Sequence, residues 1–529
     1  MEKTAVLCHI NKSTLQLWEN SIGGNQPFIP AEKAKNLLQN FIDFLSSCKC
    51  EIFLSFELSG IVADEIRQKS GNHFSELPFS HELALLKHIF QNQNISYVYY
   101  MDSVYGIVDT TLTEKLYQIH NEYSADYSFV ENGPPGITGV FFNRSLFEAL
   151  EIEQNEKSTA PEIDNAAPDS MAIPLSGYLE KNINHFHVEI HYEHPDLRLL
   201  RLDYSGKSAR SILNTTHVFD ACSKSDNYYA ELEGLYSQNP GLLHHFPSYI
   251  ELEIYGGCEY KCTFCPRQFA APPDGQMLSV TGIKSILAFA STGLNDTSFC
   301  LGGQGEPLEH PEIREILNLL LSEKSVPVVI LETNGKYLDK IFPLIDHTEF
   351  RKLKTVININ SLKNYESLHG TNILNKQKVL TNIGNFSEAA GKKNAAYKKN
   401  IIIQTLKILE NETDLDEIYD YADQNGISFL LQKYNSWAGL MPEKRVSDMT
   451  PLDRFFCWHL RRDLFVRANG NVVFCKQDIL NSKVRGNIKN ENLSEIWNSV
   501  AADWQNNYKT QYAAKPDCAR CDEYYTFNM

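Results

Sequence analysis

The chain has 529 residues, of which 43% are hydrophobic and 22% charged, and a chain of this length predicts two to four domains rather than one core. Its net charge is −17, from 49 basic and 66 acidic residues, which argues against nucleic acid as a partner because phosphate-backbone binding needs a basic face. No apolar run could span a bilayer and the first residues lack the regions of a signal peptide, so we expect a cytoplasmic protein without a membrane partner, whose 12 cysteines are reduced.

The first domain is expected over residues 1–225, where hydrophobic runs with strand and helix periods alternate. This order predicts a mostly parallel sheet covered by helices. One strand ends at Asp102, where sheets of this kind bind ligands, although a solvated carboxylate at a strand end is the simpler interpretation. The expected strands are 5–10, 51–56 and 95–101, and the expected helices are 31–47, 81–91 and 113–123, with Thr113 as a helix cap.

Segments 99–104 and 125–136 resemble sugar-nucleotide cytidylyltransferases, and segment 200–204 resembles the one that carries that family's second metal aspartate. The resemblance implies a nucleotidyltransferase-like domain. In that family the first strand enters a glycine-rich loop with basic residues that holds the triphosphate, whereas residues 8–14 here contain no glycine. Without such a cradle of N–H groups, phosphate binding loses its usual basis. We therefore favour a degenerate recognition domain, and an active nucleotidyltransferase acting on a sugar or small molecule stays the alternative.

Two further segments precede the second domain. Residues 151–174 are rich in Glu, Asp, Ala, Ser and Pro without periodicity, which is typical of a flexible excursion, and residues 226–248 are expected to form a linker. Between these two segments, four polar residues alternate along a predicted strand and therefore lie on one of its faces. They could form a metal-binding patch or an ordinary solvent-facing surface. They are His185, His187, Glu189 and His191.

A short loop with three cysteines follows the predicted strand 249–255. Gly256 and Gly257 let the backbone turn, and three thiols then stand within eight residues. A [4Fe–4S] cluster usually takes four cysteines, so three would leave one iron with an open coordination position. The alternative is a structural zinc site that takes its fourth ligand from elsewhere. The three residues are Cys258, Cys262 and Cys265.

Residues 249–445 show six β–α steps, which is an α/β pattern. In barrels built from such steps the chemistry lies at the carboxyl ends of the strands. Polar residues fall at those ends, above all in the loop 302–307. The strands are expected at 249–255, 297–301, 326–332, 354–360, 400–409 and 427–432, and the helices at 279–291, with Thr281 as a possible cap, 311–323, opened by Pro311, 339–345, 375–388 and 414–424.

Residues 446–529 carry four more cysteines, enough to saturate a second cluster, with a zinc ribbon as the rival interpretation. Segment 464–475 predicts a β-hairpin with an Asn-Gly turn. The four candidate ligands are Cys457, Cys475, Cys518 and Cys521. The remaining cysteines are expected to be structural, namely Cys8, Cys48, Cys50, Cys222 and Cys300.

The spacing C-x3-C-x2-C, with Phe264 before its last cysteine, resembles the radical S-adenosylmethionine (SAM) family. The loop 302–307 matches that family's Gly-Glu-Pro motif, and residues 446–529 resemble the short form of its SPASM, or twitch-like, auxiliary-cluster domain. The whole chain is most similar to the spiro-SPASM subgroup. This resemblance implies a partial (β/α)6 barrel over 249–445, preceded by the nucleotidyltransferase-like α/β domain and followed by a small cluster-binding domain.

The resemblance also implies cofactors and sites. The cofactors are a SAM-binding [4Fe–4S] cluster, one auxiliary [4Fe–4S] cluster and SAM itself. The implied metal ligands are the seven cysteines of the loop and of the C-terminal set, and the sequence names no catalytic acid or base. The implied SAM contacts are Phe264, Gly303, Gly305, Glu306, Pro307, Asn358, Ser361 and Gln404, of which Asn358, Ser361 and Gln404 could equally be polar strand ends.

By this resemblance the enzyme cleaves SAM reductively to a 5′-deoxyadenosyl radical, which abstracts a hydrogen atom. We expect the oxidation or cross-linking of a peptide or protein, with electron transfer as the role of the auxiliary cluster and an external donor of the flavodoxin or ferredoxin type. Two alternatives remain. One is a bifunctional protein with an active nucleotidyltransferase in front, and the other is a non-enzymatic zinc or electron-transfer module.

Overall fold

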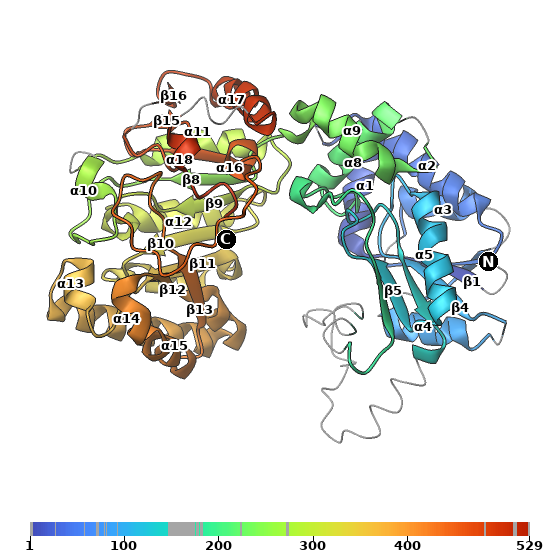
Figure 1. Cartoon of the computed structure of the whole chain (residues 1–529), viewed down its shortest axis with the longest axis horizontal. Helices are drawn as coiled ribbons and strands as arrows, with labels where there is room; N and C mark the ends of the chain where they lie inside the picture. The colour runs from blue at the N-terminus through green and yellow to red at the C-terminus, as the bar shows by residue number, and fades with distance from the viewer. Residues whose placement is uncertain are drawn as a thin grey trace. The chain divides into compact units, whose positions relative to one another are not determined.

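The computed structural model describes residues 4–26, 28–57, 59–69, 74–78, 80, 82–92, 94–146, 175, 179, 183–222, 225–270, 275–480, 483–510 and 516–526. The predicted flexible excursion over 151–174 lies outside these residues. The chain divides into two compact units, Met1–Leu242 and Leu243–Met529. Each is described by itself below (Figure 1).

The first unit is built on a seven-stranded sheet with the order β3-β2-β1-β4-β6-β5-β7. Strands β3, β2, β1 and β4 are parallel, β6 is antiparallel to both β4 and β5, and β5 is parallel to β7. The predicted α/β class is therefore confirmed. The strands are β1 (Thr4–Ile10), β2 (Glu51–Phe56), β3 (Phe74–Glu76), β4 (Tyr97–Met101), β5 (Tyr127–Val130), β6 (Val140–Asn143) and β7 (Val188–His191). The helices are α1 (Lys12–Ile22), α2 (Ala31–Ser47), α3 (Ile61–Lys69), α4 (Glu82–Phe90), α5 (Thr110–Tyr123), η1 (Arg198–Leu200), α8 (Ala209–Cys222) and α9 (Tyr228–Gln238), with η2 (Pro240–Leu243) at the boundary between the units.

Helix α9 lies inside the segment 226–248 that was expected to be a linker. Its Tyr228, Tyr229 and Tyr236 are at most 2% exposed. The backbone N–H of Tyr229 donates to Asp109 at 2.8 Å, and the hydroxyls of Tyr236 and Tyr204 are 2.9 Å apart. Burial of this aromatic face makes most of the segment part of the first unit.

Three helix starts differ from the predicted ones. Asp109 caps α5 by accepting from the N–H of Leu112 at 2.7 Å, whereas Thr113 lies within the helix. Ser279, not Thr281, caps α11 (Val280–Ser291) through the N–H of Gly282. Helix α12 (Ile313–Ser322) starts two residues after Pro311. At α5 and α11 an Asp or Ser placed three residues before a free N–H satisfies it, so this local geometry decides the start.

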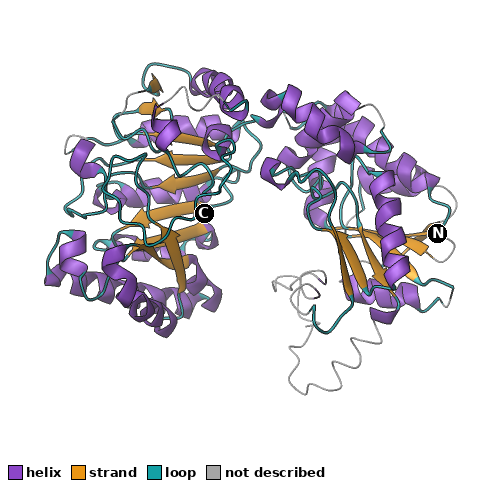
Figure 2. Cartoon of the chain, viewed as in Figure 1, coloured by secondary structure: helices purple, strands orange, loops and turns teal. Residues whose placement is uncertain are grey.

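The second unit is built on a nine-stranded sheet with the order β13-β12-β11-β10-β9-β8-β14-β15-β16. Strands β8 to β13 are parallel neighbours in chain order, which confirms the predicted partial (β/α)6 barrel. Figure 2 shows these strands with helices packed beside them. The strands are β8 (Tyr249–Leu252), β9 (Ser298–Leu301), β10 (Val329–Thr333), β11 (Leu353–Asn358), β12 (Ile401–Lys407), β13 (Ser428–Lys433), β14 (Asp463–Val466), β15 (Asn471–Val473) and β16 (Val484–Asn487). The helices are α10 (Arg267–Ala270), α11 (Val280–Ser291), η3 (Pro307–Glu309), α12 (Ile313–Ser322), η4 (Leu338–Asp346), η5 (Phe350–Lys352), α13 (Tyr365–His369), α14 (Ile373–Lys393), η6 (Ala395–Asn400), η7 (Leu409–Asp414), α15 (Leu415–Gln424), α16 (Trp458–Arg462), α17 (Leu493–Tyr508) and α18 (Pro516–Arg520).

The C-terminal part of the chain extends the barrel sheet. Strand β14 is parallel to β8 and antiparallel to β15, which confirms the predicted hairpin. Gly470 forms its turn with a φ of +91°, a conformation that glycine accepts at low cost. The pairing of β14 with β8 was not predicted, because hydrophobic periodicity identifies a strand but not its neighbour.

Side chains of the barrel strands alternate between two hydrophobic cores. Ile250, Phe299 and Leu331 belong to a large cluster that includes residues of the flanking helices, whereas Cys300 and Ile330 belong to a smaller cluster that contains Tyr249, Val356, Ile402 and Phe465. Since successive residues of a strand point to opposite faces, the polar residues at the strand ends that continue the second row face the barrel interior.

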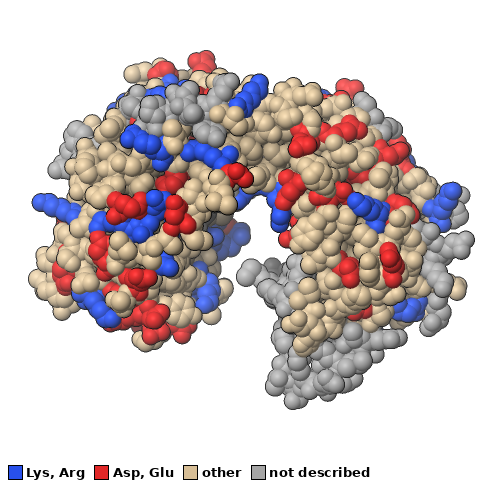
Figure 3. Space-filling model, in the orientation of Figure 1, with Lys and Arg blue, Asp and Glu red and all other residues tan. Residues whose placement is uncertain are grey.

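Charged side chains of both signs intermingle on the face of the molecule drawn in Figure 3. Within the described part of the chain, no helix combines the length and the apolar character needed to cross a membrane.

Candidate active site

A cavity of about 670 Å³ lies in the second unit at the carboxyl ends of the barrel strands. Its lining brings together all seven cysteines that the sequence analysis singled out, although they span more than 260 residues of the chain. The loop after β9 and the ends of β10, β11, β12 and β13 complete the wall. The residues that line the cavity include Cys258, Cys262, Cys265, Gly303, Gly305, Glu306, Asn334, Asn358, Gln404, Lys433, Cys457, Cys475, Cys518 and Cys521.

The loop with three cysteines is fixed by the backbone of α13. The N–H of Lys261 donates to the carbonyl of His369 at 3.2 Å, and that of Thr263 donates to Leu368 at 2.9 Å. Gly370, the residue after α13, allows this close approach, because a Cβ atom there would lie 2.3 Å from the carbonyl oxygen of Lys261. The middle of the loop is therefore held in place before any ligand binds.

Burial raises the pKa values of these thiols. Burial, then the nearby Glu306, raises the pKa of Cys258 to about 12. Burial, then the neighbouring Cys265 and Cys258, raises the pKa of Cys262 far above its usual range. If all three thiols lost their protons, three negative charges would be buried close together. A bound metal centre would neutralise these charges and stabilise the thiolates. The donor set therefore fits an iron–sulfur cluster with one uncoordinated iron.

Glycines let the loop after β9 approach the cysteine loop. A Cβ on Gly305 would lie 1.7 Å from the carbonyl oxygen of Tyr255, and one on Gly303, which has a φ of +92°, would lie 2.9 Å from the Cβ of Glu253. The N–H of Glu306 donates to Gly257 at 2.7 Å. The two predicted motifs therefore contact each other through the backbone, as a shared ligand requires.

The carboxylate of Glu306 is buried at the edge of the cavity. It accepts hydrogen bonds from the hydroxyl of Thr333 at 2.6 Å, from the N–H of Asn334 at 2.8 Å and from the N–H of Leu308 at 3.0 Å. An ionised carboxylate has about four acceptor positions, so room for one further donor remains. Burial outweighs these bonds and raises the pKa of Glu306 to about 7.

Other predicted SAM contacts also reach the cavity. Asn358 and Gln404 are opposite each other on β11 and β12 and are joined by a hydrogen bond of 2.9 Å from the amide of Gln404. The Oε1 atoms of Gln404 and Gln304 and the Nδ2 atom of Asn334 are buried without a hydrogen-bond partner. Because buried polar atoms are normally paired, two acceptors and one donor here fit a polar ligand such as SAM. Phe264 adds an aromatic wall.

Two predicted SAM contacts are not part of the cavity wall. Ser361 is fully buried; its hydroxyl donates to Asp414 and accepts from the N–H of Asn364 at 2.7 Å. Pro307 is buried as the first residue of η3, after the cap Glu306. Both residues hold the loops behind the site. The sequence places them after a strand but does not show whether their side chains reach the cavity.

The four C-terminal cysteines come from three separate segments. Cys457 precedes α16, Cys475 follows β15, and Cys518 and Cys521 lie in and after α18. Burial raises the pKa of Cys457 to about 12. Burial, followed by the other three thiols, raises the pKa of Cys475 far more. All four cysteines line the same cavity, which fits a fully coordinated cluster.

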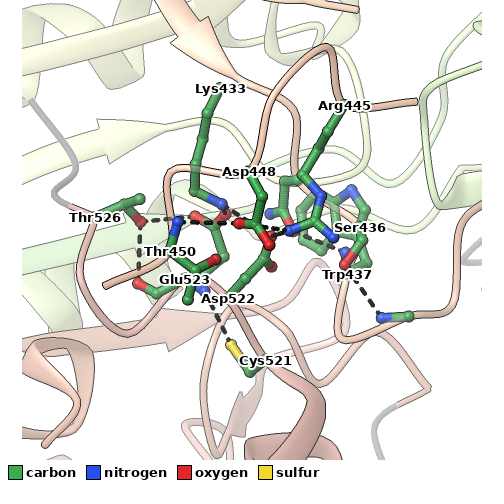
Figure 4. A network of polar contacts seen from close by, with 12 residues as sticks. Lys433, Ser436, Trp437, Arg445, Asp448, Thr450, Cys521, Asp522, Glu523 and Thr526 are labelled. Carbon is green, nitrogen blue, oxygen red and sulfur yellow. Dashed lines mark hydrogen bonds and ion pairs between the residues drawn. The ribbon is translucent and has the colours of Figure 1, made fainter. Parts of the chain in front are cut away.

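A network of charged side chains holds the segment after Cys521 against the barrel (Figure 4). Lys433, at the end of β13, pairs with Asp522 at 3.2 Å and with Glu523, and Arg445 reaches Asp522 at 3.4 Å. The N–H of Glu523 donates to the sulfur of Cys521 at 3.3 Å. The network thereby links the last barrel strand to a predicted cluster ligand.

Several polar residues of the barrel interior were not predicted from the sequence. Lys476 follows Cys475 and pairs with Glu251 of β8 at 2.9 Å. Burial alone would lower the pKa of Lys476, but the two carboxylates of Glu251 and Glu332 raise it. The only sequence signal was a glutamate at the inward position of an apolar strand. That signal does not identify the lysine partner more than 200 residues away.

The histidine-rich face in the first unit pairs with carboxylates. His187 contacts Glu189 at 2.9 Å, and His191 contacts Glu193 at 3.0 Å.

In the described part of the chain, no three Cys, His, Asp or Glu side chains are arranged to hold a metal ion. The cluster assignment above therefore rests on the shared cavity, on the thiol chemistry and on the family match reported below.

Asp102 lies at the end of β4, as predicted. Its carboxylate accepts from the hydroxyl of Tyr105 at 3.0 Å and pairs with the ammonium group of Lys207. Segment 200–204, which contains Asp203, lies close to Lys207 in the chain, and a Cβ atom on Gly206 would lie 2.4 Å from the carbonyl oxygen of Val104. The carboxylate at this strand end is therefore paired with a lysine.

The sequence matches two family models. Residues 252–422 match the radical SAM superfamily, and residues 457–522 match SPASM, an iron–sulfur cluster-binding domain. An uncharacterized protein of Treponema pallidum (strain Nichols) is 24% identical over 365 residues, which are 66% of this chain and 97% of that protein.

Two solved structures show limited similarity. SuiB of Streptococcus suis bound to the precursor peptide SuiA has a TM-score of 0.40 and 16% identity over 51% of this chain and 70% of that chain. A cytidylyltransferase from Leptospira borgpetersenii has a TM-score of 0.33 and 14% identity over 46% of this chain and 97% of that one.

Proposed function

From the premise that this chain is a radical SAM enzyme with a SPASM domain, we propose that it oxidises or cross-links a peptide or protein substrate by hydrogen abstraction. The cluster and SAM, when bound, supply the 5′-deoxyadenosyl radical that abstracts the hydrogen atom. The chain itself binds and orients both reactants and excludes water from them.

One observation carries this proposal. A single cavity of about 670 Å³ is lined by the cysteine loop, by the glycine-rich loop and by the four C-terminal cysteines. A substrate in this cavity would lie close to both sets of thiols. The volume falls within the range of ligand sites in proteins.

We assign the residues of the cavity as follows. Cys258, Cys262 and Cys265 hold the SAM-binding cluster. The ionised carboxylate of Glu306 accepts a hydrogen bond from the amino group of SAM through its one free acceptor position. The side-chain amide of Asn334, whose Nδ2 atom has no hydrogen-bond partner, donates to the carboxylate of SAM. The four C-terminal cysteines hold one auxiliary cluster for electron transfer, and a flavodoxin or ferredoxin supplies electrons from outside.

Support for a peptide as the substrate comes from the edge of the barrel sheet. Strand β13 is the end strand of the nine-stranded sheet, and its last two residues, Gln432 and Lys433, line the cavity. An edge strand presents main-chain groups with which an extended peptide forms hydrogen bonds. A peptide that pairs with β13 would therefore run beside the cavity.

The substrate class can be tested by isotope transfer. The anaerobically reconstituted holoenzyme is mixed with SAM, dithionite and either the peptide fraction or the small-molecule fraction of cells grown in deuterated medium. We expect deuterium in 5′-deoxyadenosine from the peptide fraction, because the radical takes its hydrogen from the substrate. Deuterium from the small-molecule fraction alone would contradict a peptide substrate.

A control separates this result from the radical chemistry itself. The same assay with Cys262→Ala should yield no 5′-deoxyadenosine from either fraction. If the wild-type protein also formed none in any mixture, the radical SAM assignment itself would fail, not only the substrate class.

A further inference from the structure

The imidazole of His369 lies against the cysteine loop and is absent from every motif considered above. It is the last residue of α13, 1% exposed, and part of the cavity lining. Its Nδ1 atom is 3.8 Å from the sulfur of Cys262. This is within the range of a hydrogen bond to sulfur, so the position of the ring proton decides what the contact does.

The proton position follows from the other ring nitrogen. Nε2 lies 3.1 Å from the backbone N–H of Asn360, which donates to it. A backbone N–H can only donate, so Nε2 must be the acceptor and cannot carry a proton. A neutral imidazole has one N–H, which must then be on Nδ1. The geometry therefore selects the tautomer whose N–H points at Cys262.

The surroundings fix the ring in this orientation. Tyr365 stacks on it with 4.4 Å between ring centroids and an interplanar angle of 19°, and Phe264 meets it edge-on at 5.4 Å. Asn360, the donor to Nε2, is itself held, because its side-chain oxygen accepts from the N–H of Leu406 at 2.7 Å. The imidazole therefore cannot turn away without breaking several contacts.

We propose that His369 is a positioning residue that donates an Nδ1–H hydrogen bond to the Cys262 sulfur and thereby raises the reduction potential of the cluster held by Cys258, Cys262 and Cys265. Hydrogen bonds to the ligating sulfurs are among the factors that set the potential of an iron–sulfur cluster. The added electron makes the sulfur a stronger acceptor, and a hydrogen bond to a more negative acceptor is stronger. The donor therefore favours the reduced state.

The C-terminal cysteines provide an internal reference. Among their described contacts, Cys521 accepts from the backbone N–H of Glu523 at 3.3 Å, and His369 contacts Cys262 of the other set. A change at His369 should therefore alter one cluster and leave the second unchanged. This inference rests on the assignment of Cys262 as a ligand in the proposed function.

The test is an EPR-monitored redox titration of the reconstituted holoenzyme. His369→Phe keeps an aromatic ring between Tyr365 and Phe264 but removes the donor, whereas His369→Gln keeps an N–H. We expect a more negative midpoint potential of the SAM-site cluster in His369→Phe, a smaller shift in His369→Gln and no shift of the auxiliary cluster. Equal potentials in His369→Phe and wild type would overturn the proposal, as would equal shifts of both clusters.

A second measurement does not depend on the variants folding. ENDOR spectroscopy of the reduced wild-type cluster should detect, after ¹⁵N-histidine labelling, one coupled imidazole nitrogen. Absence of this nitrogen coupling would overturn the hydrogen bond. If instead the EPR signal assigned to this site persisted in Cys262→Ala, the ligand assignment would fail, which distinguishes that failure from failure of the His369 inference.

Discussion

The two sets of cysteines differ in how the chain brings them together. Cys258, Cys262 and Cys265 stand within eight residues on one loop, whose backbone is bound by the neighbouring α13. The other four come from three segments spread over 65 residues, and a charge network ties the last segment to β13. The first site is local and the second is assembled by tertiary structure. Loss of a ligand in the first should therefore affect chemistry most, and loss in the second should affect stability as well.

The largest effect is expected for Cys262→Ala. Without its central thiolate the local site cannot hold a cluster, so formation of 5′-deoxyadenosine from SAM and dithionite should be lost completely. Iron bound to the C-terminal cysteines and the melting temperature should change little, because the loop is held by backbone contacts. A fall in melting temperature as large as that of a C-terminal cysteine variant would contradict the comparison.

Cys521→Ala should produce the converse pattern. It removes one ligand of the assembled site and an acceptor of the N–H of Glu523, so the melting temperature of the holoenzyme should fall and about half of the iron should be lost. SAM cleavage should persist, whereas substrate conversion should stop. Differential scanning calorimetry, iron analysis and product assays report these three quantities. Unchanged thermal stability would show that the second site is not a structural link.

Glu306 provides a pH-dependent test of the local site. With its pKa raised to about 7 by burial, the carboxylate is about nine-tenths ionised at pH 8 and about one-tenth at pH 6. If the ionised form binds the amino group of SAM, the Kd for SAM should rise up to about tenfold as the pH falls over this range. Isothermal titration calorimetry measures it. Glu306→Gln should bind SAM weakly at both pH values, and a wild-type Kd that is constant over this range would exclude the role.

Lys433→Ala should have a smaller effect at the assembled site. It leaves Asp522, which is 9% exposed on its side chain, and Glu523 without their main cation, which should lower the free energy of unfolding by about 1–3 kcal/mol. Lys392→Ala is the matched control, because its partner Glu388 is exposed on α14. Urea denaturation of both variants checks the difference, and equal effects would mean that the network does not hold the C-terminal segment.

The smallest effect is expected in the first unit. Asp102→Asn should leave SAM cleavage unchanged, because Asp102 belongs to the first unit and is not among the residues that line the cavity. Turnover of CTP by the wild type that is abolished in Asp102→Asn would instead support an active nucleotidyltransferase.

The features that could be predicted from the sequence alone are those that depend on residues close together in the chain. The cysteine spacing, the glycine-rich loop and the six β–α steps each follow from local pattern, and the barrel and both cofactor-binding domains are confirmed. The pairing of β14 with β8 and the approach of Lys476 to Glu251 depend on contacts between residues far apart in the chain. Ser361, a polar residue at a strand end, was expected at the ligand, and its hydroxyl donates a hydrogen bond to Asp414.

The account depends most on the local site and its reaction with SAM. The most direct measurement is the anaerobic incubation of the reconstituted protein with SAM and dithionite, scored for 5′-deoxyadenosine by mass spectrometry. The account predicts 5′-deoxyadenosine and methionine from the wild type and none from Cys262→Ala. A protein that carries only zinc at these thiolates and leaves SAM intact would contradict it.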